Sequence, residues 1–114
     1  MISFKKGKYF IYYYEKDGKK TVKEVDGYLF EYGGMKFGCK KEGFEWNLTE
    51  LKTGLKVNNF HIDKRNSIEA ELDKRPLFIE TIKKALNNDG NKEIMKIIQA
   101  EKDKRQTNGK KRLF

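Results

Sequence analysis

The first half of the chain alternates between aromatic or aliphatic positions and polar positions with the short period of β-strands. The strongest such segment is residues 8–15 (KYFIYYYE), because aromatic and β-branched side chains favour strands. Asp17-Gly18 follows it, a dipeptide typical of two-residue hairpin turns. Turn signals separate the other strand-like segments, which are residues 20–25, 28–32, 35–40, 44–51 and 55–57. This spacing predicts a four- to five-stranded antiparallel meander over about residues 8–57.

The period of the pattern lengthens to that of helices after about residue 62. Asp63 suits the N-cap of a first helix, Pro76 the first turn of a second, and Asn91 the N-cap of a third. The predicted helices cover about residues 63–72, 76–87 and 91–101. We therefore expect an α+β fold in which residues 1–101 form a single domain, with about three helices packed on one face of the sheet.

The charge of the chain is uneven. The formal net charge is +9, and residues 102–112 hold six basic residues against Asp103. Because the apolar period fades after Glu101 and Asn108-Gly109 interrupts it, we expect residues 102–114 to form a flexible basic tail. Such a tail can follow a phosphate backbone, or it can stay solvated without any partner.

Side-chain parity indicates which strand faces are buried. In residues 35–40, Met35, Phe37 and Cys39 share one face of the strand. The same alternation occurs in residues 44–51, where the apolar set is Phe44, Trp46 and Leu48. Both strands are therefore expected to have one buried face and one wet face, and Cys39 is predicted to be a structural core thiol.

The first strand differs, because it has large apolar groups on both faces. Tyr9, Ile11 and Tyr13 point to one side, and Phe10, Tyr12 and Tyr14 point to the other. Only one side can join the core, so the tail, a partner or a ligand must cover the other, or it forms an exposed patch. The predicted binding residues are Tyr12, Tyr14, Lys23 and Lys36. Parity alone leaves Tyr9 and Tyr13 as the alternative pair.

Residue types that enzymes use are scarce. The single histidine, His61, excludes a two-histidine metal site, and Cys39 has the apolar parity of its strand. Ser3 and Ser67 lie in no nucleophile motif. Gly33-Gly34 lies between two strands, whereas a phosphate-binding loop leads from a strand into a helix. We predict no enzymatic activity, no bound metal and no cofactor.

The compartment follows from three absences in the sequence. No apolar run approaches the roughly 20 residues that span a bilayer, so we expect no membrane association. Residues 1–6 contain no apolar signal core. The one cysteine cannot form an internal disulfide, as is usual for a protein of a reducing compartment. The expected location is the cytoplasm.

Residues 46–55 (WNLTELKTGL) combine an aromatic strand, a Thr-Gly turn and a short second strand before the helix predicted to begin at Asp63. In this arrangement, over about residues 44–72, the chain resembles small accessory proteins of phages and conjugative elements of Gram-positive bacteria. It departs from their pattern at Asn58-Asn59, where a glycine often lies, and at Asp63, where threonine is usual. The resemblance implies a class that includes anti-CRISPR proteins, non-catalytic inhibitors that cover a surface of a host defence complex.

We therefore expect a non-enzymatic binding protein of a mobile genetic element that inhibits a host nucleic-acid-guided defence nuclease. The alternative is a module for single-stranded RNA or DNA, in which sheet aromatics stack on bases and lysines hold phosphates. The expected partner is thus a protein, such as a defence ribonucleoprotein, or a nucleic acid. Exposed aromatics also favour a homo-oligomer. The candidate phosphate-binding lysines are Lys8, Lys19, Lys20, Lys23, Lys36, Lys40 and Lys41.

Overall fold

Four antiparallel strands, in the part of the chain that the structure describes, form one sheet in sequence order. The structure is a computed structural model that describes residues 2–57, 60 and 62–112. The strands are β1 (Lys5–Tyr14), β2 (Lys20–Tyr32), β3 (Met35–Glu42) and β4 (Glu45–Glu50). Gly33 and Gly34, both with positive φ, form the β2–β3 turn, as the sequence predicted. The predicted meander is confirmed.

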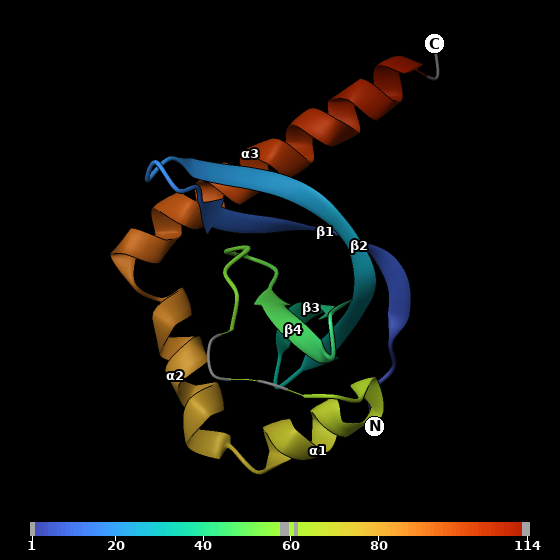
Figure 1. Ribbon diagram of the computed structural model, residues 1–114. Coiled ribbons are helices and arrows are strands. Elements are labelled where there is room, and N and C mark those ends of the chain that lie inside the picture. Colours follow the sequence, from blue (N-terminus) through green and yellow to red (C-terminus); the bar gives the residue numbers. More distant parts are fainter. Residues whose placement is uncertain (1, 58–59, 61, 113–114) are drawn as a thin grey trace.

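The described residues after the sheet form a short 3-10 helix and three α-helices. These are η1 (Arg65–Ser67), α1 (Ile68–Asp73), α2 (Pro76–Leu86) and α3 (Asp89–Arg112). Figure 1 shows α1 below the sheet, α2 beside it and α3 crossing above, with the last turns of α3 extending away from the body. The α+β arrangement of a sheet followed by helices is therefore confirmed.

Two predicted helix boundaries differ from the structure. The prediction of Asp63 as an N-cap is wrong: residues 64–67 first complete a 3-10 turn, in which the Ser67 N–H donates to the Lys64 carbonyl oxygen, and α1 begins only at Ile68. Helix α3 continues past Glu101, because lysine, arginine and glutamine residues there have good helix propensity, although they add nothing to its apolar face. The flexibility expected of the C-terminal tail stays a prediction.

The sheet curls strongly because two of its glycines allow very close approach of backbone and ring. A Cβ atom at Gly27 would lie 2.4 Å from the carbonyl oxygen of Cys39. A Cβ atom at Gly38 would lie 2.7 Å from ring atoms of Tyr9, which packs on that glycine. The bend expected at Gly27 therefore occurs inside one continuous strand of 13 residues, where the sequence suggested two. Figure 1 shows β2 as a long arch whose inner side is the concave face of the sheet.

Residues 54–57 connect the two free edges of this curled sheet. On the β1 side, the backbone N–H of Tyr12 donates a hydrogen bond to the carbonyl oxygen of Gly54 at 2.6 Å. On the β4 side, the N–H of Val57 donates to the carbonyl oxygen of Leu48 at 2.8 Å. The predicted fifth strand is thus a short bridging segment, and together with the sheet it encloses an incomplete barrel.

A buried carboxylate, that of Glu50, fixes the turn that carries Gly54. Glu50 is only 3% exposed. Its side chain accepts hydrogen bonds from the N–H groups of Lys52 and Thr53, both at 2.9 Å, and from the Thr53 hydroxyl at 3.0 Å. Three donors offset much of the cost of burying the carboxylate. The turn therefore holds the Gly54 carbonyl in place opposite β1.

The main core lies between the outer face of the sheet and the helices α1 and α2. Its buried residues are Phe30, Met35, Phe37, Cys39, Leu48, Val57, Phe60, Ile62, Ile68, Leu72 and Ile79. The rings of Phe30 and Phe37 stack with their centroids 5.4 Å apart. The burial predicted from parity is confirmed for β3, but it is wrong for Phe44, which is 91% exposed because it lies in the β3–β4 turn next to Gly43.

We expect Cys39→Ala to lower the free energy of unfolding by about 1 kcal/mol and to leave binding functions intact. The thiol is fully buried, and burial raises its pKa to about 12, although the charge of Arg65 opposes the shift. It is therefore protonated and unreactive at neutral pH. Urea unfolding and a binding assay on the same variant check this. A folded Cys39→Ala protein that no longer binds its partner would show that the thiol is functional.

A second, smaller core lies on the outer face of the β1–β2 hairpin. Phe10 and Tyr12 are buried there together with Ile98 of α3, and the partly buried residues around them are Val22, Leu55 and Ile94. Ile94 and Ile98 lie one turn apart, so both reach the strand from the same side of α3. The surplus aromatic side of β1 is thus covered by α3 of the same chain.

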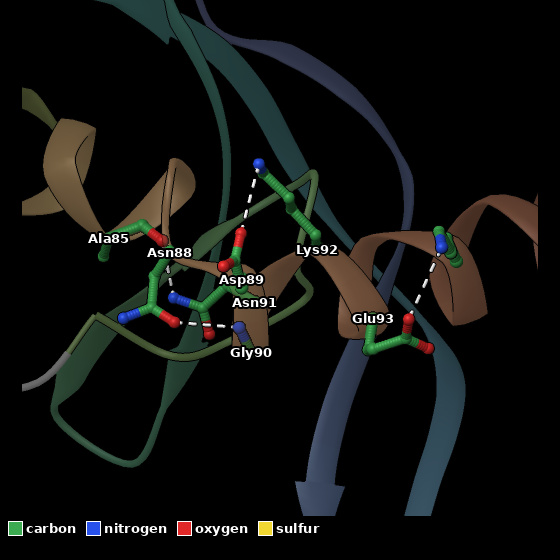
Figure 2. A network of polar contacts seen from close by, with 8 residues as sticks. Ala85, Asn88, Asp89, Gly90, Asn91, Lys92 and Glu93 are labelled. Atoms are coloured by element: carbon green, nitrogen blue, oxygen red, sulfur yellow. Dashed lines mark hydrogen bonds and ion pairs between the residues drawn. The ribbon is translucent and has the colours of Figure 1, made fainter.

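The junction between α2 and α3 directs α3 across β1. The side-chain oxygen of Asn88 accepts a hydrogen bond from the N–H of Gly90 at 2.8 Å, so Asn88, and not the predicted Asn91, caps α3. Asn91 instead donates from its amide to the carbonyl oxygen of Ala85 at 2.6 Å (Figure 2). These bonds tie the first turn of α3 to the end of α2, and they fix the direction in which α3 leaves.

We expect the protein to lose stability as the pH rises from about 9 to about 12. Burial raises the pKa of Cys39 from 9.0, and the hydrogen bond from the Tyr32 hydroxyl to Asp73 raises the pKa of Tyr32 from 10.0, in both cases to about 12. Because the unfolded chain releases these protons first, their stabilisation is complete below pH 9.0 and disappears as the pH rises through the folded-state values. Urea unfolding at several pH values measures this, and a constant midpoint across the range would exclude it.

Candidate functional site

The curled sheet encloses a small cavity on its inner face. The cavity has a volume of about 150 Å³, and all four strands of the sheet line it together with Gly54 and Lys56. Its apolar walls are Ile11 and Tyr13 of β1 and Val25 of β2. These side chains share the concave face. Ile11 and Tyr13 lie two and four residues after Tyr9 on β1, and Val25 is the residue of β2 that pairs with Tyr9.

Hydroxyl and amide groups from β1 and β4 supply the polar part of the cavity. Tyr9 and Thr49 are buried, and both line the cavity. Burial raises the pKa of Tyr9, so its hydroxyl stays protonated at neutral pH. Asn47, two residues before Thr49 on the same face, is half-buried, and its side-chain amide makes no hydrogen bond within the described part of the chain.

Three lysines, Lys23, Lys40 and Lys56, line the same cavity from three different segments. The ammonium group of Lys23 lies 5.3 Å from the ring centroid of Tyr13, a cation–π contact. Among the described residues, none of the three lysines forms an ion pair. Glu42 is the acidic residue of the lining, so positive charge is in excess here.

An open groove of about 770 Å³ shares Lys40 with the cavity, but its strand residues Tyr28 and Trp46 have the parity of the outer face. Its aromatic lining is Tyr28 and Trp46, whose ring centroids lie 5.9 Å apart. Lys8, which also lines it, forms an ion pair with Asp26 at 4.0 Å. The lysines of the cavity and the groove together are Lys6, Lys8, Lys23, Lys40, Lys41 and Lys56, and we call this the lysine-lined surface.

Arg65 orders the aromatic wall of the groove. Its guanidinium carbon lies 3.9 Å from the ring centroid of Tyr28 and 5.7 Å from that of Trp46. Phe4 contacts the same guanidinium, with its ring centroid at 5.4 Å. The positive group packed among three rings restricts their movement, so the groove has a preformed aromatic side.

Lysines on the helices have a different environment from those on the sheet. Several lie beside an acidic residue one helical turn away: Lys74 with Glu71, Lys83 with Glu80, Lys92 with Asp89, and Lys96 with Glu93, at 3.3 to 3.7 Å. Such pairs contribute little to stability, but they neutralise charge locally. At the lysine-lined surface, most lysines have no such partner among the described residues, which favours a polyanionic ligand.

The structure does not bring the four predicted binding residues together. Tyr12 is only 4% exposed and packs under α3, so its ring is not available to a ligand. The side chain of Tyr14 lies outside the described part of the structure, although its backbone pairs with Lys20. Lys23 and Lys36 lie on the opposite, concave parity, and Lys36 lines a separate depression near Leu51. The alternative tyrosine pair, Tyr9 and Tyr13, lines the cavity with Lys23 from the concave face, and Tyr12 also contributes to the lining.

Sequence reasoning missed three residues of the cavity: Asn47, Thr49 and Lys56. The alternation in β4 showed that Asn47 and Thr49 share a polar face, but it did not show that this face curls towards β1. Lys56 follows Gly54 in the bridging segment, and only the closure of the sheet edges places it beside β1 and β2. The signal that could have found them is the pair of strand glycines, Gly27 and Gly38.

Searches for a metal site, for a membrane-spanning helix and for related proteins identify no further feature of this site among the described residues. Within the described ranges, no three histidine, cysteine or acidic side chains gather as metal ligands, and His61, the single histidine, lies outside those ranges. No helix in the described part of the chain is long and apolar enough to cross a membrane. In comparisons with known proteins, no family model, no curated protein and no solved structure matches the chain.

Proposed function

We propose that this protein is a non-enzymatic, cytoplasmic binding protein that holds single-stranded nucleic acid on the lysine-lined surface. The observation that carries the proposal is the group of lysines around an aromatic-lined cavity and groove, of which Lys23, Lys40 and Lys56 have no acidic partner among the described residues. Lysines at such positions neutralise phosphates, and this contributes most of the affinity of non-specific nucleic-acid binding. The aromatic side chains Tyr13, Tyr28 and Trp46 provide faces on which unpaired bases stack.

A single strand suits this surface better than a duplex. The cavity is enclosed by strands on several sides, so only a base that has left a stack can enter it. The groove is wider and open, and it shares Lys40 with the cavity. An unstacked base of a single strand can therefore enter the cavity, whereas the bases of a duplex stay paired and stacked.

Fluorescence anisotropy with a labelled single strand and the matching duplex, over a range of salt concentrations, tests the proposal. Six phosphate contacts give a slope of about −4 for the logarithm of the affinity against the logarithm of the salt concentration. We expect a slope of this order for the single strand and weaker binding of the duplex. No binding at low salt, or an affinity that does not change with salt, would reject the proposal.

Removing residues 105–114 is expected to leave the melting temperature within a few degrees of the full chain. The part of α3 that packs on the sheet ends near Ile98, and residues 103 and 104 are already exposed. The deletion also removes four basic residues, so it should reduce the salt slope by at most about 3. Thermal unfolding and the anisotropy assay separate the two effects. A large fall in melting temperature would mean that the removed residues pack on the body.

A second candidate is the inhibition of a host nucleic-acid-guided defence nuclease by a protein of a mobile element. It is favoured by Phe44, a nearly fully exposed aromatic side chain at the tip of the β3–β4 hairpin. Exposed aromatics at such positions are frequent anchors of protein interfaces. Target cleavage by purified guided nucleases, measured with the native protein and with Phe44→Ser, tests this candidate. Inhibition that needs Phe44 but is insensitive to salt would favour it over nucleic-acid binding. Self-association stays a prediction, to be tested by sedimentation.

A further inference from the structure

We infer that the cavity on the inner face of the sheet binds one pyrimidine base of the bound strand. This rests on the proposed function and adds a base preference to it. The inference comes from three properties of the cavity: its volume, the chemistry of its polar groups, and the position of the lysines around it.

The volume of the cavity selects for a single ring. An apolar cavity of about 150 Å³ in another protein accommodates one benzene molecule. The present cavity has the same volume, about 150 Å³, and Ile11, Tyr13 and Val25 form its apolar walls. A pyrimidine has one six-membered ring and fits this space, whereas the two fused rings of a purine exceed it.

Asn47 provides the polar recognition that a pyrimidine requires. Its side-chain amide offers both a donor and an acceptor, and it makes no hydrogen bond within the described part of the chain. The pairing edge of uracil, thymine or cytosine likewise presents adjacent donors and acceptors. By contrast, Thr49 is only 5% exposed, so it forms part of the floor of the cavity.

The lysines are placed to hold the phosphates on either side of this base. Lys23 lies on β2, Lys40 on β3 and Lys56 in the bridging segment, so they surround the cavity instead of lying along one side. A nucleotide whose base is inserted must leave its phosphates outside, next to these ammonium groups. Lys40 also lines the groove, so it is in reach of a neighbouring phosphate.

The test compares uridine, cytidine and adenosine homopolymers of equal length in the anisotropy assay at one salt concentration. We expect the two pyrimidine strands to bind about tenfold more tightly than the adenosine strand. Asn47→Ala removes the recognition group, and Val25→Phe fills the cavity. Each variant should bring the three affinities within about twofold of one another while the salt slope stays unchanged. Asn66→Ala, at an exposed position in η1, is the matched control and should retain the preference.

The outcomes separate this inference from the proposed function. Equal, salt-dependent binding of all three homopolymers would overturn the inference and leave nucleic-acid binding in place. A preference for adenosine, or a pyrimidine preference that survives in both Asn47→Ala and Val25→Phe, would also overturn it. If no homopolymer binds at low salt, both ideas fail. Thermal unfolding of each variant shows whether it is folded, and Asn47→Ala keeps the test decisive if Val25→Phe does not fold.

Discussion

Replacing Lys23, Lys40 and Lys56 together with glutamine is expected to weaken single-strand binding roughly a hundredfold at about 0.1 M salt. The three ammonium groups line the cavity and have no acidic partner in the described part of the chain, so each is free to neutralise a phosphate. The salt slope should also become shallower by about 2. Because these lysines line the cavity and are not part of the hydrophobic core, the melting temperature of the triple variant should hardly change. Anisotropy titrations over a salt series and thermal unfolding measure both effects.

The matched control replaces Lys64, Lys74 and Lys84 with glutamine. These lysines are exposed in the helical layer, so the control changes the net charge by the same amount at a different place. A general effect of protein charge on binding would weaken both triple variants equally. That result would contradict the assignment of the lysine-lined surface as the binding site.

The second large effect is a loss of folding stability when Gly27 is replaced with alanine. Gly27→Ala should lower the free energy of unfolding by about 3 kcal/mol or more, because the new Cβ atom would lie 2.4 Å from the backbone oxygen of Cys39. No side-chain rotation relieves a contact with the backbone, so β2 and β3 would have to separate at the centre of the sheet. The curl would open, and the cavity would lose its shape. Urea unfolding followed by circular dichroism measures the loss.

Gly7→Ala is the control for this effect, since Gly7 pairs directly with Gly27 across β1 and β2. A Cβ atom at Gly7 would meet the Cδ1 methyl group of Leu29 at 3.1 Å, and that side chain can move. We expect a cost of about 1 kcal/mol or less for this variant. Similar losses for Gly7→Ala and Gly27→Ala would show that the close approach of Gly27 to Cys39 does not maintain the curl.

Much of the fold was predictable from local signals. Asp17-Gly18 and Gly33-Gly34 mark turns that the structure contains, and Pro76 begins α2 as expected. The core face of β3 followed from its alternation. These features depend on residues a few positions apart, which is the range over which turn chemistry and side-chain parity act. Phe44 was misplaced because a two-residue turn and a strand end have the same local sequence pattern.

The candidate site was less predictable, because it depends on contacts between distant segments. The surplus aromatic face of β1 was recognised, but which element covers it depends on how α3 crosses the sheet, and this is fixed by Asn88 and Asn91 at a junction far along the chain. Tyr12 was therefore chosen although its ring packs against Ile98 of α3, whereas Tyr13 has the parity of the concave face. Strand alternation cannot show that Gly27 allows a sheet to curl, since a glycine also marks bulges and ordinary turns.

The central claim, that the lysine-lined surface binds nucleic acid, is tested most directly by nuclear magnetic resonance. Backbone amide signals of the labelled protein are followed while a uridine homopolymer is added. We expect the largest shifts at Lys23, Lys40 and Asn47, with small shifts in α1 and α2. Shifts concentrated on those helices, or no shifts at a strand concentration that saturates binding, would contradict the claim.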